Sequence, residues 1–153
     1  MSNKSEPAPD TTVRATWALT LASLVPFFVL AAALAYLGKE NALFFPLLDA
    51  FKTGAAIALS FLGGIRWGLA LTQAASVRRD LVLAILPPLL GWACLFMPDP
   101  LSIAILLLGF AAQGAWDSIS AQRTGMPLWF ARLRALATLI IAGIHMVVFF
   151  AAY

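Results

Sequence analysis

Four polar or charged residues lie inside long apolar stretches of this sequence, where their side chains could do chemistry. Arg66 interrupts one apolar run, Gln113 and Asp117 share a second, and His145 lies in the last. Gln113 and Asp117 are four residues apart and therefore share one face of a helix. A charge at mid-membrane costs about 2.5–3.5 kcal/mol, so Arg66 needs a partner or water. We predict an ion pair between Arg66 and Asp117, with Gln113 beside it.

The role of this polar group stays open at the level of sequence. The pair could be a structural salt bridge that locks two helices together, which is the interpretation we favour. It could instead form a site for a substrate, a lipid headgroup or a proton, or Arg66 could simply extend to the membrane surface. His145 has the same two interpretations, because a buried histidine is either a hydrogen-bonded structural group or a proton relay or cofactor ligand.

The composition identifies the environment of these residues. Of the 153 residues, 62% are hydrophobic and 11% are charged, whereas soluble domains are about 45–50% apolar and about 25% charged. This excludes a soluble enzyme, a disordered chain and a nucleic-acid-binding protein. With one cysteine and one histidine, the chain offers neither an intrachain disulfide nor a cysteine-based metal site. We therefore expect no enzymatic activity, no cofactor and no metal.

The apolar runs predict an all-α integral membrane protein, a bundle of five transmembrane helices. Each run has about 17–21 residues, enough to cross a hydrocarbon layer of roughly 30 Å. The predicted spans cover residues 17–37, 53–73, 81–97, 101–121 and 133–152. Residues 1–14 are polar and predict a disordered cytoplasmic tail, so residues 15–153 form a single domain.

The basic residues predict the orientation. Seven of them fall on one side of the predicted spans, namely Lys4, Arg14, Arg78, Arg79, Arg123, Arg132 and Arg134. Only Lys39 and Lys52 fall on the other side. Basic residues accumulate on the cytoplasmic side of membrane proteins. We expect the N-terminus inside and the C-terminus outside, in a bacterial inner membrane or, in a eukaryote, the mitochondrial inner membrane.

Small residues mark a predicted packing face. Ser60, Gly64 and Gly68 repeat at four-residue spacing, which lets two helix backbones approach closely in a membrane. The partner helix could lie in the same chain or in a second copy, and we favour the same chain.

A last motif combines an aromatic residue with arginines at a predicted membrane edge. Trp129, Arg132 and Arg134 stand at the start of the fifth span. The simpler interpretation is an anchored helix start. The alternative is a surface that binds anionic lipid or the acidic loop of another membrane protein.

Two segments of the chain resemble a known family. One is LSFLGGIRWG at residues 59–68, and the other is Asp117 followed by PLWF at 127–130 and RLR at 132–134. They are similar to the domain of unknown function that small bacterial membrane proteins share with mitochondrial transmembrane protein 69. The resemblance covers about residues 15–152 and implies a multi-span inner-membrane protein, with no activity to carry over.

Three classes of function remain from the sequence, of which a membrane enzyme is the least favoured. Small size and several predicted packing faces favour a non-enzymatic accessory or assembly protein of a larger inner-membrane complex. The alternative is a binder or carrier of a small molecule, lipid or porphyrin, built around Arg66 and Asp117. The lipid bilayer is the expected environment in both cases, with other membrane proteins or anionic lipid as further partners.

Overall fold

The computed structural model describes residues 10–72, 77–124 and 127–153, and every regular element within these ranges is an α-helix. The helices are α1 (Asp10–Leu37), α2 (Phe44–Thr72), α3 (Val77–Cys94), α4 (Asp99–Thr124) and α5 (Leu128–Ala152). The all-α prediction is therefore confirmed for this part of the chain.

Four of these helices are long and apolar enough to cross a membrane. They are α1, α2, the Asp99–Asp117 part of α4, and α5. Helix α3 is not among them, since it has 18 residues and places Arg78, Arg79 and Asp80 near its start. The chain is thus a membrane protein with several apolar helices.

Two helices begin earlier than the sequence predicted. Helix α2 begins at Phe44, nine residues before the start of the predicted span at 53–73. Phe44, Leu48 and Phe51 are buried at helical spacing, so this segment packs into the bundle as a helix. Helix α1 begins at Asp10, so residues 10–14 are helical rather than part of a disordered tail. The remainder of that predicted tail, residues 1–9, lies outside the described residues.

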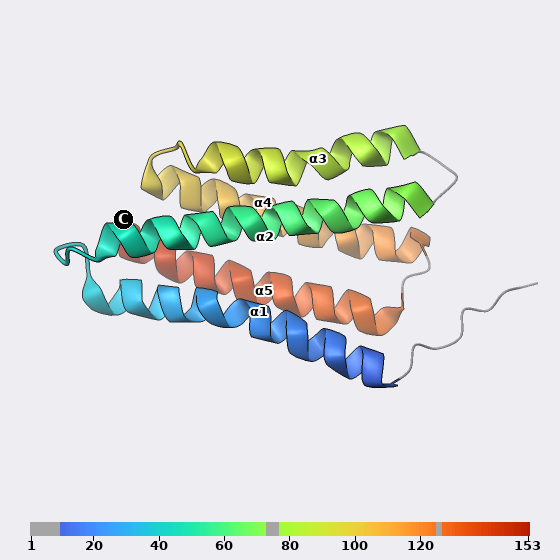
Figure 1. Cartoon of the computed structure of the whole chain (residues 1–153), viewed down its shortest axis with the longest axis horizontal. Coiled ribbons are helices and arrows are strands. Elements are labelled where there is room, and N and C mark those ends of the chain that lie inside the picture. The colour runs from blue at the N-terminus through green and yellow to red at the C-terminus, as the bar shows by residue number, and fades with distance from the viewer. Residues whose placement is uncertain (1–9, 73–76, 125–126) are drawn as a thin grey trace, which may run out of the picture.

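The helices run side by side and alternate in direction (Figure 1). Helices α1, α2, α4 and α5 form a ring, because α1 contacts α2 and α5, and α4 contacts the same two helices. Helix α3 packs on the outside of this ring, most extensively against α2 and also against α4. One end of the bundle therefore collects the starts of α1, α3 and α5 with the ends of α2 and α4 (Figure 1).

The centre of the ring is filled by one aromatic side chain from each of its four helices. The rings of Phe27 and Phe51 meet edge to face at 5.7 Å. His145 lies between Phe51, at 4.8 Å, and Phe110, at 5.2 Å. Aromatic pairs at such separations contribute beyond their buried area, so this layer joins α1, α2, α4 and α5.

The close approach of α2 and α3 depends on two glycines. A Cβ at Gly63 would lie 2.5 Å from the Ala84 carbonyl oxygen and 2.7 Å from Pro88 Cδ. A Cβ at Gly91 would lie 2.9 Å from the Ala56 Cα. Only residues without a Cβ fit at both positions, so the two backbones pack directly against each other.

The predicted internal role of Ser60, Gly64 and Gly68 is wrong. All three are exposed on the outer surface of α2, and no atom of the described residues lies within 4 Å of a Cβ built at Gly64 or Gly68. Gly63, next along the chain to Gly64, takes the internal position instead, because a one-residue step turns a helix by about 100°.

Candidate functional site

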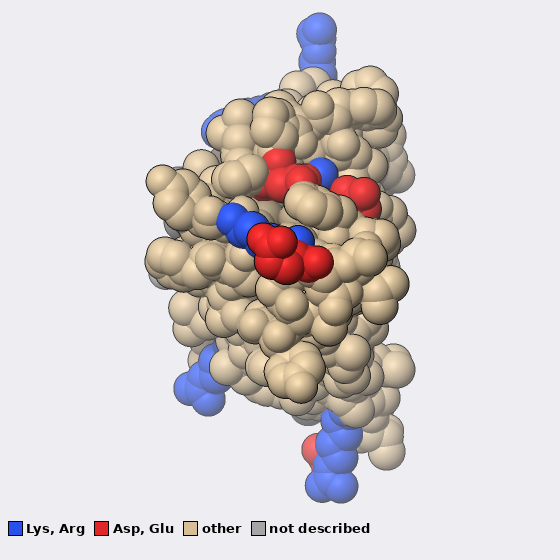
Figure 2. Space-filling view, turned by 90° about the vertical axis from the view of Figure 1, so that its left-hand side faces the viewer, with Lys and Arg blue, Asp and Glu red and all other residues tan. Residues whose placement is uncertain are grey.

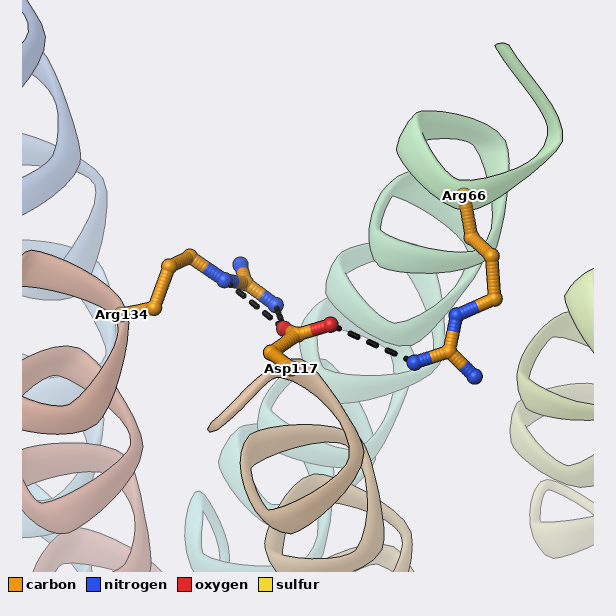
Figure 3. Close-up of polar contacts among 3 residues, drawn as sticks. All are labelled: Arg66, Asp117 and Arg134. Carbon is orange, nitrogen blue, oxygen red and sulfur yellow. Dashed lines mark hydrogen bonds and ion pairs between the residues drawn. The ribbon is translucent and has the colours of Figure 1, made fainter. Parts of the chain in front are cut away.

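Three charged residues inside the bundle gather at the end where α2 and α4 finish and α5 begins. Arg66 from α2 donates through Nη2 to Asp117 Oδ1 on α4, at 3.3 Å. Arg134 from α5 donates to the other oxygen, Oδ2, from Nε at 2.9 Å and from Nη2. Figure 3 shows the carboxylate between the two guanidinium groups. We call these three residues the inner cluster.

The three helices bring these side chains to the same depth. Arg66 lies six residues before the end of α2 at Thr72, and Arg134 lies six residues after the start of α5 at Leu128. Asp117 lies seven residues before the end of α4 at Thr124. At about 1.5 Å per residue, each stands roughly 9–11 Å from its helix end. Matched depth is why the three side chains can meet.

The structure brings together Arg66 and Asp117, the pair that the sequence placed at one level, and adds Arg134. From the sequence, Arg134 was an interfacial residue grouped with Trp129 and Arg132. In the structure it points into the bundle, whereas the Arg132 side chain is exposed. Trp129 is half-buried and its ring lies 5.7 Å from that of Phe130.

An aromatic ring completes the inner cluster. The Arg66 guanidinium carbon lies 4.8 Å from the centre of the Trp116 ring, and that of Arg79 from α3 lies 6.0 Å from it. Cation–π contact is favourable at these distances, more so where water is excluded. Asp80, also on α3, acts electrostatically on Arg66. Helix α3 is therefore linked to the cluster through charge and an aromatic ring.

Gln113 lies one turn deeper than Asp117 on the same helix. It is buried, and its amide nitrogen Nε2 has no hydrogen-bond partner among the described residues. An unpaired buried amide costs free energy unless water reaches it. Gln113 and Asp117 lie one turn apart on α4, as predicted. The hydrogen bond that joins Arg66 to α4 is made to Asp117.

His145 lies far from the inner cluster, in the central aromatic layer. Its Nδ1 is 2.8 Å from the Ile141 carbonyl oxygen one turn earlier, so Nδ1 donates to that oxygen. Its Nε2 is buried and has no hydrogen-bond partner within the described part of the chain. The side chain is fully buried and held between two phenylalanine rings. This geometry is that of a packed structural histidine.

A second group of charges lies at the opposite end of the bundle, and the sequence did not predict it. Lys52 Nζ contacts Asp99 Oδ1 at 2.7 Å and Asp49 Oδ1 at 3.5 Å. Lys52 itself is buried, although both aspartates reach solvent. We call these residues the outer cluster. Seen end-on, this face is mostly uncharged, with its charges gathered near the middle (Figure 2).

The described residues contain no group of three histidine, cysteine, aspartate or glutamate side chains that could hold a metal ion. What the inner cluster can do is bind charge. Two guanidinium groups on one carboxylate tie α2, α4 and α5 together, and they leave positive charge in excess.

The chain is similar in sequence to known membrane proteins. A family model described as a protein of unknown function, DUF3429, matches residues 12–150. Transmembrane protein 69 of Mus musculus is 33% identical over 127 residues, which cover 80% of this chain and 50% of that protein. The Xenopus tropicalis protein of the same name is 36% identical over 90 residues, or 57% of this chain and 35% of the relative. The chain thus spans half or less of these relatives. No solved structure gives a significant match.

Proposed function

Since the chain belongs to the DUF3429 family, we propose that it is a non-enzymatic accessory or assembly protein of a larger complex in the inner membrane. In this proposal the bundle is a scaffold, and its outer surface binds a helix of another membrane protein. The inner membrane is that of a bacterium, or of a mitochondrion in a eukaryote.

The observation that carries this proposal is the unoccupied face of α2. Ser60, Gly64 and Gly68 line it, and a Cβ at either glycine would meet nothing within 4 Å. Phe61 and Trp67, which flank this row, are also exposed. A row of small residues between large ones forms a shallow groove into which a second transmembrane helix can pack closely. The internal contacts of α2 use other residues, so this groove is left for a partner.

The proposal includes five membrane crossings with the N-terminus inside. Helix α3 lies alongside the other helices and alternates with them in direction (Figure 1), which supports its crossing the membrane. Its charged residues, Arg78, Arg79 and Asp80, fall at the end of the bundle that carries the inner cluster. Its remaining residues, 81–94, carry no charge.

The basic residues support the same orientation. Of the described arginines, Arg14, Arg78, Arg79, Arg132 and Arg134 belong to the end with the inner cluster, as does Arg66. The opposite end has Lys39 and Lys52. By the positive-inside rule, the inner cluster faces the cytoplasm or the matrix.

Partner retention tests the proposed function directly. The tagged full chain is extracted from its host membrane in mild detergent, and co-purified proteins are quantified by mass spectrometry. Gly64→Leu fills the groove, whereas Gly143→Leu is a matched control at another helical glycine with nothing within 4 Å. We expect wild type and Gly143→Leu to retain the same partner, and Gly64→Leu to retain about tenfold less.

Equal partner retention by all three proteins, or no partner with any of them, would refute the accessory role. Recovery of a second copy of the chain alone would replace it with a homodimer. Because nothing faces Gly64 within the bundle, the melting temperature of Gly64→Leu in detergent should match wild type, which separates lost binding from lost folding.

A further inference from the structure

The inner cluster and its surroundings have an excess of positive charge. Arg66 and Arg134 share Asp117, and Arg79 is the third arginine near the Trp116 ring. Asp80 is the second acidic group that acts on Arg66. Three arginines against two aspartates leave a formal net charge of +1. An uncompensated charge in a low-dielectric region is costly, so this region favours an added anion.

Donor groups for an anion are present and directed away from Asp117. Arg66 uses one terminal nitrogen on the carboxylate, and Arg134 uses Nε and one terminal nitrogen. The second terminal nitrogen of each guanidinium points away from the carboxylate (Figure 3). The two side chains are 13% and 17% exposed, so part of each reaches the surface of the bundle. Guanidinium groups bind phosphate oxygens with charge-assisted hydrogen bonds.

The depth of the cluster fits the boundary between acyl chains and headgroups. Helix α2 has 29 residues and is about 42 Å long, some 12 Å more than the hydrocarbon layer. If the excess is divided equally, about 6 Å of α2 extends beyond each side. Arg66 is about 9 Å from the helix end and so lies roughly 3 Å inside the hydrocarbon boundary. A flexible arginine at that depth reaches the headgroup phosphates.

We infer that the inner cluster is an anion site that binds a phosphate group, through Arg66 and Arg134, at the inner surface of the membrane. The ligand in the membrane is the headgroup of an anionic phospholipid, which has a net charge opposite to that of the cluster. Free phosphate has the same chemistry and is the alternative source. The site is independent of the Ser60–Gly64–Gly68 groove, so either can fail without the other.

Native mass spectrometry of the purified full chain tests the site. The chain in detergent is titrated with phosphatidylglycerol, with phosphatidylcholine as the lipid of no net charge, and separately with inorganic phosphate. Arg66→Gln and Arg134→Gln each remove one donor and leave a one-to-one pair with Asp117, so both variants should fold. Arg132→Gln removes an exposed arginine two residues from Arg134 and is the matched control.

We expect wild type and Arg132→Gln to bind phosphatidylglycerol in preference to phosphatidylcholine. Arg66→Gln and Arg134→Gln should each bind it about fivefold more weakly, the value of one basic residue near an anionic surface. Displacement of phosphatidylglycerol by millimolar phosphate would identify free phosphate as the ligand, and retention would identify the lipid. Equal binding by all four proteins, or equal loss in Arg132→Gln and the cluster variants, would overturn the site.

Discussion

Each end of the bundle has a cluster in which one charged residue is shared by two residues of opposite charge, and the signs are reversed between the two ends. In the inner cluster, one aspartate is shared by two arginines, so positive charge is in excess. In the outer cluster, one lysine is shared by two aspartates, so negative charge is in excess. The central Lys52 of the outer cluster is more buried than its two aspartates, whereas the central Asp117 of the inner cluster is slightly more exposed than its two arginines. In the orientation that we propose, the sign of the surplus follows the positive-inside rule.

Burial also differs between the two clusters. At the inner end all three side chains are largely buried, so each depends on the others for hydrogen bonds. At the outer end only Lys52 is buried, and Asp49 is 73% exposed. A broken pair is costly where the remaining charge cannot reach water, and cheap where it can. The inner cluster should therefore matter more to stability.

The largest effect is expected from Asp117→Ala. It leaves two guanidinium groups without their shared carboxylate, so thermal unfolding in detergent should show a loss of about 3 kcal/mol, the lower end for a broken buried pair. The variant with Arg66→Met, Asp117→Leu and Arg134→Met removes all three charges and should recover most of the loss. A loss below about 1 kcal/mol, typical of a surface pair, would show that the cluster is solvated.

Arg134 changes which residues a compensating variant must replace. The sequence alone suggested replacing Arg66 and Asp117 together, as an isolated pair. In the structure that change would leave Arg134 without the carboxylate that it contacts. We expect the double variant Arg66→Met with Asp117→Leu to remain less stable than the triple variant by about 1–3 kcal/mol, measured in the same unfolding assay.

A smaller effect is expected when one arginine of the inner cluster is removed. Arg66→Gln leaves Asp117 paired with Arg134, and Arg134→Gln leaves it paired with Arg66. Arg66→Gln should cost about 1.5 kcal/mol, the lower value for one hydrogen bond to a charged group. Arg134→Gln should cost somewhat more because Arg134 makes two such bonds, and in both variants the melting temperature should fall less than with Asp117→Ala. A loss as large as that of Asp117→Ala would mean that one arginine alone holds the carboxylate.

The smallest effect is expected at the outer end, from Lys52→Met. The methionine keeps the buried volume, and Asp99 and Asp49 can be hydrated because both reach solvent. The free energy of unfolding should change by no more than about 1 kcal/mol. A loss equal to that of Asp117→Ala would remove the contrast between the two clusters.

The sequence was informative where a charge interrupts an apolar run. Arg66 and Asp117 could be paired because each stands alone in a long hydrophobic segment at a matched distance from its end. Arg134 was missed as a member of the cluster because it stands near other arginines at a loop, where basic residues usually mark orientation. Lys52 was missed because Pro46, followed by Asp49, favours a loop before the predicted span, whereas the helix that contains Lys52 begins at Phe44.

Helix rotation is the feature that the sequence could not supply. Gly63 and Gly64 are neighbours, and either could lie on the packing face. The four-residue spacing of Ser60, Gly64 and Gly68 favoured the second. Packing against α3 decides between them, because Pro88 lies against Gly63, and Gly91 lies against Ala56 on the same face of α2. Such a preference depends on the partner helix and is not visible in the periodicity of α2 alone.

The orientation, the lipid site and the contrast between the clusters all require that the two clusters lie at opposite membrane surfaces, with the inner one in the cytoplasm. Five crossings place the C-terminus outside, whereas four crossings, with α3 remaining on one side, return it to the inside. The most direct measurement is a pair of C-terminal fusions in a bacterial host. We predict an active alkaline phosphatase fusion and a dark green fluorescent protein fusion. A fluorescent C-terminal fusion with inactive phosphatase would contradict both the orientation and the crossing of α3.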